Sequence, residues 1–123
     1  MTKKEQPLLP LDAASVVSLE KEIQFAPNGI VSRTLLAAPS LRLVLFGFDK
    51  GQELTEHISP RRALVQALSG VCEFTVNGRP HRLQAGQMLF MPAGAPHSVR
   101  ALERFAMLLT LFPAREEDQP ANS

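Results

Sequence analysis

A chain of 123 residues is expected to form one domain, because domains most often contain about 100–150 residues. Hydrophobic residues make up 45% of the chain, which is enough for one packed core. The 13 Lys and Arg residues nearly balance the 12 Asp and Glu residues, so no basic field exists to attract nucleic acid or an anionic membrane. Cys72 is the only cysteine, which excludes an intramolecular disulfide and a multi-cysteine zinc site.

Both ends of the chain are polar and contain prolines. We expect flexible tails over residues 1–10 and 113–123, flanking a single domain of residues 11–112. The amino terminus lacks the apolar run of a signal peptide, and no segment approaches the roughly 20 apolar residues of a membrane span. We therefore expect a cytoplasmic protein that binds neither membranes nor nucleic acid.

Short apolar runs separated by turn signals predict an all-β protein. The clearest turn is Asn77-Gly78, because both residues tolerate the positive φ of a type I′ hairpin. The only helix candidate, residues 15–25, is weakened by β-branched residues. Strands are expected near residues 16–19, 29–37, 41–49, 53–58, 62–69, 71–77, 80–84, 87–91, 97–101 and 104–112.

Alternation along the strands predicts which side chains face the core. Cys72 should point inward with its alternate neighbours and should be a buried, inert thiol. Leu89 and Met91 share a face and should line the interior. Residues 41–46 and 105–111 are apolar on both faces, so a second layer must cover one of them. A partner subunit is the simplest source of that layer, which predicts a homodimer.

Two glycine-punctuated segments, residues 51–70 and 86–101, each carry one histidine. They resemble the two sequence motifs of the cupin superfamily, in particular its small, single-domain, RmlC-like members. The similarity spans about residues 29–112 and implies a double-stranded β-helix, a jelly-roll barrel of two facing antiparallel sheets. The motif residues that this chain retains are Gly51, His57, Gly70, Gly86, Pro92, Gly94 and His97.

In the family, the first motif supplies His, His and Glu to a metal, and the second supplies one more His. Here Ser59 stands at the second His position and Ala63 at the Glu position, so only His57 and His97 remain as ligands. Glu53 is the one carboxylate on the same strand face as His57 by alternation. We expect at most a weakly bound divalent ion, Mn, Fe, Ni or Zn, and no required cofactor.

A pocket for a small organic molecule is expected between the two motifs. Arg61 and Arg62 follow the first motif near the expected mouth, where we interpret them as a solvated charged pair, with contact to a substrate carboxylate as the alternative. His81 is expected to face solvent. The residues expected to line the pocket are His57, Ser59, Ala63, Leu89, Met91 and His97.

Three functions remain open. The first is a cupin barrel that binds a small molecule and has a depleted metal site. The second is a metal-dependent cupin enzyme, such as a dioxygenase or an isomerase, that uses His57 and His97. The third is metal-free acid–base catalysis resembling the family's sugar epimerases, with His57 as the base. That branch pairs its His with a tyrosine, and this chain contains none.

Overall fold

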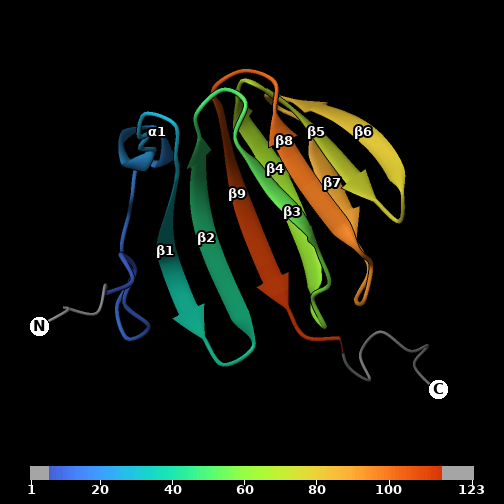
Figure 1. Cartoon of the computed structure of the whole chain (residues 1–123). Coiled ribbons are helices and arrows are strands. Elements are labelled where there is room, and N and C mark those ends of the chain that lie inside the picture. The colour runs from blue at the N-terminus through green and yellow to red at the C-terminus, as the bar shows by residue number, and fades with distance from the viewer. Residues whose placement is uncertain (1–5, 115–123) are drawn as a thin grey trace, which may run out of the picture.

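The computed structural model describes residues 6–114 of the chain. One helical turn is followed by nine strands (Figure 1). In chain order the elements are α1 (Leu19–Glu22), β1 (Ile30–Ala38), β2 (Leu41–Phe48), β3 (Glu53–His57), β4 (Arg62–Ser69), β5 (Val71–Val76), β6 (Arg79–Gln84), β7 (Met88–Met91), β8 (His97–Ala101) and β9 (Phe105–Phe112).

The strands form two antiparallel sheets. A five-stranded sheet has the order β1-β2-β9-β4-β7, and a four-stranded sheet has the order β3-β8-β5-β6. Two pairs are hairpins of consecutive strands, β1 with β2 and β5 with β6, while others join strands distant in sequence, such as β4 with β9 and β3 with β8. This is the jelly-roll arrangement that the two motifs imply, so the predicted all-β fold is confirmed.

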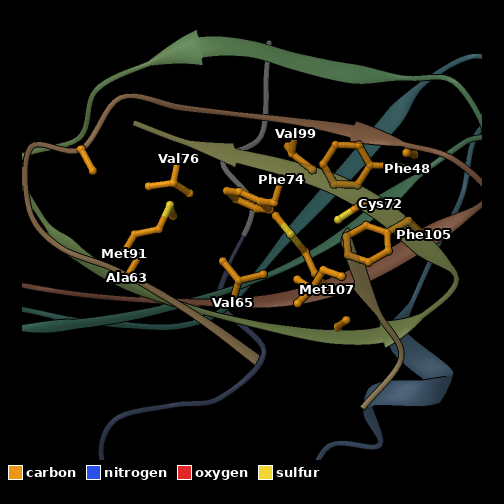
Figure 2. Close-up of a cluster of buried hydrophobic side chains, with 14 residues drawn as sticks. Phe48, Ala63, Val65, Cys72, Phe74, Val76, Met91, Val99, Phe105 and Met107 are labelled. Atoms are coloured by element: carbon orange, nitrogen blue, oxygen red, sulfur yellow. The ribbon is translucent and has the colours of Figure 1, made fainter. Parts of the chain in front are cut away.

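The inner faces of the two sheets meet in one apolar core. Cys72, Phe74 and Val76 alternate inward along β5, as the sequence pattern predicts. Figure 2 shows how the core extends from Phe48 and Phe105 at one end to Val76, Ala63 and Met91 at the other. Ala63 and Met91 at this second end also line a cavity.

Two connections show why particular residues are needed at the turns. Val76 pairs with Arg79, which leaves Asn77 and Gly78 as a two-residue loop with φ of 53° and 76°. The hairpin is therefore the one predicted from these residues. Gly70 links β4 to β5 at φ 78°, and a Cβ there would collide with the carbonyl oxygen of Arg104. Only glycine fits this position without displacing the neighbouring chain.

The predicted strand at residues 16–19 is wrong. Val16 is 96% exposed and pairs with no strand, and Leu19–Glu22 forms a single helical turn instead. The carbonyl of Ser18 accepts hydrogen bonds from the N–H groups of Lys21 and Glu22. Leu, Glu and Lys favour helix, and this local preference prevails where the segment pairs with no strand.

The segment before β1 covers part of the outer face of the five-stranded sheet. A Cβ on Gly47 would collide with the carbonyl oxygen of Gln24. The carboxylate Oε1 of Glu22 lies 3.7 Å from Nη1 of Arg33 on β1. This chain therefore supplies part of the second layer that the sequence analysis assigned to a partner. Leu8 and Leu9, placed in the predicted tail, donate backbone hydrogen bonds to β1, and residues 115–123 of the other tail lie outside the described residues.

Candidate functional site

Strand pairing brings the two motif histidines face to face. β3 and β8 are neighbours in the four-stranded sheet, and His57 lies directly opposite His97. Their ring centroids are 4.2 Å apart, and the ring planes are inclined at 60°. His97 is buried, whereas His57 is exposed at the mouth. The expectation that the two imidazoles form one site agrees with this geometry.

Hydrogen bonds to backbone carbonyls favour one tautomer of each neutral imidazole ring. Nδ1 of His57 lies 2.9 Å from the carbonyl oxygen of Thr55, and Nδ1 of His97 lies 2.9 Å from that of Ala95. A carbonyl oxygen only accepts, so each Nδ1 carries the proton and donates it. In each neutral ring Nε2 is then the unprotonated nitrogen, able to accept a hydrogen bond or to bind a metal.

Glu53 does not join the histidines. The pairing of β3 with β8 shifts register between Leu54 and His57, so a β-bulge interrupts the alternation that the sequence analysis assumed. Leu54 packs against the core, while Glu53 lies opposite the exposed Arg100 on the outer face. The parity argument for Glu53 as a third ligand was therefore wrong.

A cavity of about 230 Å³ lies between the histidines and the five-stranded sheet. Of the six pocket residues expected from the sequence, all but Leu89 line it; Leu89 points inward on β7 but packs deeper against the core. Five further residues line the cavity: Arg61 was expected near its mouth, and the other four were missed. The full lining is His57, Ser59, Arg61, Ala63, Met91, Pro92, Ala95, His97, Leu109 and Leu111.

The missed residues line the cavity because of contacts between segments that are distant in sequence. Leu109 and Leu111 alternate inward on β9, but β9 joins this wall only because it pairs with β4. The loop residues Pro92 and Ala95 are held near the first motif because Gly94 donates a hydrogen bond to the carbonyl of Ser59. The apolar alternation along residues 105–111 was the available signal, but the prediction used that run only as evidence for a second layer and a partner subunit.

The neighbouring arginines at the mouth have different surroundings. Arg62 stacks over the Phe112 ring, 4.4 Å from its centroid, and donates to the carbonyl of Pro113. Arg61 instead lines the cavity. The interpretation of the two as a solvated pair was thus wrong for Arg62. His81 is half-buried opposite Phe74, outside the cavity lining.

The donor set does not fit a tightly held metal. Within residues 6–114, no group of three or more His, Cys, Asp or Glu side chains is placed to bind one ion. The Ser59 hydroxyl oxygen accepts a hydrogen bond from the N–H of Arg61, and Ala63 contributes only a methyl group. Protein metal sites ordinarily use three or four protein ligands, and here only two imidazoles are available.

The buried thiol takes no part in this site. Cys72 is fully buried in the core, as predicted, and is not among the cavity-lining residues. Burial, and to a lesser extent the charge of Glu73, raises the pKa of the thiol to about 12. Cys72 is therefore neutral at physiological pH and unsuited to nucleophilic or redox chemistry.

Comparisons with known proteins agree with the fold. A structure of SPY1581, a conserved protein of unknown function from Streptococcus pyogenes, has 35% identity and a TM-score of 0.78, over 92% of this chain and 99% of that one. A cupin superfamily protein from Desulfitobacterium hafniense has 23% identity and a TM-score of 0.77, over 89% and 99% of the respective chains. The likeness to the second structure supports the fold alone.

A curated relative is the dimethylsulfoniopropionate lyase DddQ of Ruegeria pomeroyi, 32% identical over 85 residues. That match covers 68% of this chain but only 42% of the lyase, so the chain spans less than half of that relative. In residues 6–114 no helix is long and apolar enough to cross a membrane. The family model Cupin_2, "Cupin domain", matches residues 44–112. The chain therefore belongs to the cupin superfamily.

Proposed function

We propose that the barrel binds a small organic molecule between the two histidines and the apolar wall, and that binding requires no resident metal. The observation that carries this proposal is the pair of facing imidazoles, each held by a backbone carbonyl, at one side of a largely apolar cavity. A few convergent polar groups on apolar walls are typical of ligand sites.

The size of the cavity narrows the class of ligand. At about 230 Å³ it is smaller than the roughly 300–1,000 Å³ of pockets for drug-sized ligands, so a small metabolite is the appropriate occupant. The wall of Met91, Leu109 and Leu111 suits an apolar body, and the unprotonated Nε2 atoms suit a hydroxyl or amine that donates hydrogen bonds.

Histidine NMR combined with ligand screening tests this proposal. Small metabolites that bind should shift the side-chain resonances of His57 and His97 and raise the melting temperature, with little change at His81. His57→Ala and His97→Ala should weaken binding, while the matched variant His81→Ala should retain it. A screen in which ligands bind equally well to all three variants would place the binding site elsewhere.

One observation favours a metal-dependent enzyme as the second candidate. Each imidazole already donates Nδ1–H to a backbone carbonyl, the support that metal-binding histidines usually have. The lyase relative shows that a related chain can be catalytic. Metal analysis of protein purified without a histidine tag separates the candidates: one tightly held equivalent would favour the enzyme, whereas substoichiometric metal with binding of metabolites would favour the metal-free barrel.

We also propose that the protein is a cytoplasmic homodimer. Met88 and Phe90 are 58% and 53% exposed on the outer face of β7, the edge strand of the five-stranded sheet. Phe90 lies beside Leu64 of β4, so the exposed side chains continue onto a partly covered apolar face. Such patches usually mark interfaces. A single buried thiol suits a reducing compartment.

A further inference from the structure

A second cavity of about 240 Å³ lies beside the first, at the turn between β1 and β2 and the end of β9. Arg61 and Leu111 line both cavities, so the two spaces are neighbours at the mouth of the barrel. The residues that line the second cavity are Ala37, Ala38, Pro39, Ser40, Leu41, Arg42, Arg61, Leu111, Phe112, Pro113 and Ala114.

Strand register shows which residues lie between the two cavities. Arg42 of β2 lies opposite Leu111 of β9, which lies opposite Ala63 of β4, which lies opposite Met91 of β7. Residues directly opposite in antiparallel strands share a face, so these four form one row on the inner side of the sheet. Strands are about 4.8 Å apart, so Arg42 begins about 10 Å from Ala63, with Leu111 between them.

The second cavity is electropositive. Among residues 6–114, Arg42 and Arg61 are the only charged residues that line it, and no Asp or Glu of that range contributes. Arg42 donates to the Thr34 hydroxyl, and within residues 6–114 neither arginine has a carboxylate partner. Two guanidinium groups beside apolar walls are complementary to an organic anion, because a guanidinium can donate two parallel hydrogen bonds to a carboxylate.

We propose that the two cavities form one elongated site for a small hydroxy acid. The carboxylate binds between Arg42 and Arg61, the aliphatic chain crosses Leu111, and the hydroxyl donates to an Nε2 of the histidine pair. The carboxylate accepts hydrogen bonds from the arginines at one end, and the hydroxyl donates one to an imidazole nitrogen at the other. This assignment rests on the proposed function and adds the class of ligand.

Calorimetric titration of the full chain with ω-hydroxyhexanoic acid and with its primary amide tests the assignment. The two probes differ only in the charged end. The acid should bind about 10- to 100-fold more tightly than the amide, because hydrogen bonds to charged groups exceed neutral ones by that margin. Equal affinity of the two probes would overturn the anion subsite.

Variants locate the charged end. Arg61→Gln and Arg42→Gln should each reduce the ratio of acid affinity to amide affinity by about tenfold or more, because a carboxylate gains more from a guanidinium than a neutral amide does. The melting temperature of each variant reports whether its barrel is intact. Arg82→Gln is the matched control, since Arg82 is exposed on β6 and lines neither cavity. If both cavity variants still bind the acid more tightly than the amide by the wild-type ratio, the proposal is wrong.

Two further outcomes separate this inference from the proposed function. If metabolites shift the histidine resonances but neither probe binds, the barrel site stands and the hydroxy-acid class is wrong. The acidic residues Glu116, Glu117 and Asp118 follow the second cavity in sequence, so a variant with all three converted to amides should bind the acid with unchanged affinity. A gain of tenfold or more would assign the arginines to the chain's own carboxylates and would overturn the proposal.

Discussion

At the scale of single residues, two positions determine what the site can do. Ser59 and Ala63 stand where the family places a second His and a Glu. Both line the cavity, and Ala63 is only 3% exposed. A methyl group at this position leaves an apolar wall where a carboxylate would carry charge. Two of the family's four metal ligands are therefore replaced here, and the proposed ligand binding relies on the two imidazoles that remain.

Restoring ligands should have a larger effect than removing them. The double variant Ser59→His, Ala63→Glu adds two ligands to His57 and His97, so it should bind Mn, Ni or Zn far more tightly than the wild type. Without metal it should melt at a lower temperature, because the new glutamate lies in an apolar wall. Calorimetric titration and melting curves with and without chelator measure both effects.

The matched control for this experiment is Glu53→Gln, which should leave metal affinity unchanged because Glu53 lies on the outer face opposite Arg100. Wild-type protein should show little change in melting temperature with chelator. Submicromolar binding of one metal equivalent by the wild type would contradict the prediction that the site has too few protein ligands for tight binding.

Cys72 should be unreactive in the folded protein. Burial raises the pKa of its thiol from 9.0 to about 12, so at pH 8 the thiolate fraction is roughly a thousandfold lower than in the unfolded chain. A chromogenic disulfide reagent should therefore label Cys72 only as the protein unfolds. Labelling in native buffer at the rate found in denaturant would show that the residue is accessible and would contradict the packing.

At the scale of elements, the bulge in β3 decides which residues enter the site. Strict alternation places Glu53 with His57, whereas the observed pairing places Leu54 inward instead. A bulge inserts one residue into one strand of a pair, so it changes parity without leaving a clear mark in the local sequence. The presence of His57 in the site could be predicted from its motif, whereas the outward position of Glu53 could not.

Gly70 is required where β4 turns into β5. Gly70→Ala should destabilise the fold by about 3 kcal/mol or more, because alanine disfavours φ of 78° and its Cβ would collide with the Arg104 carbonyl. Gly86→Ala is the control: φ is 90°, but the space around it is open, so the loss should be about 1–2 kcal/mol. Urea unfolding measures the free energy of unfolding of both variants. Equal decreases in the two variants would show that the structure around Gly70 shifts to accommodate the added Cβ.

Asp49 links the turn before β1 to the turn after β2. Its carboxylate accepts hydrogen bonds from the backbone N–H groups of Asn28 and Lys50 and from Arg104, and these hold its pKa below the usual 3.8. A lowered pKa in the folded state means that the stabilisation is present above pH 3.8 and is lost as the pH falls through the lowered value.

Asp49→Asn should therefore be less stable than the wild type near neutral pH, and the difference should shrink in acid. Urea unfolding of both proteins at a series of pH values from about 6 down to about 2 measures the effect. A stability difference that stays constant over that range would show that the carboxylate charge does not contribute.

At the scale of the whole molecule, the outer face of the five-stranded sheet has two differently covered parts. The segment before β1 packs over Gly47, while Met88 and Phe90 remain exposed at the β7 edge. The segment before β1 covers only part of this apolar face. Pairing with a second copy of the chain would bury the part that remains exposed.

The homodimer predicts a measurable change of mass. Light scattering at micromolar concentration should give twice the chain mass of 13.5 kDa. Phe90→Glu and Met88→Glu should each shift the protein toward the monomer, since a buried charge at an interface is unfavourable. Val16→Glu is the control, because Val16 is 96% exposed on the segment before β1. A wild-type monomer would contradict the prediction.

The sequence by itself determined the features that depend on neighbouring residues. Asn77-Gly78 specified a hairpin because both residues adopt positive φ, and Pro92 ended β7 because proline donates no hydrogen bond to a ladder. Alternation placed Cys72 and Met91 in the core. The spaced motifs added the family and with it the pairing of strands far apart in the chain.

Only the tertiary structure decided what depends on partners distant in sequence. Residues 16–19 would form a strand only by pairing with a sheet edge, and they do not pair; Leu19–Glu22 forms a helical turn instead. The face occupied by Glu53 depends on a bulge in the pairing with β8. Arg61 and Leu111 lie between two cavities because β9 pairs with both β2 and β4. Local propensity does not determine such pairings, because cross-strand contacts join residues that are far apart in the sequence.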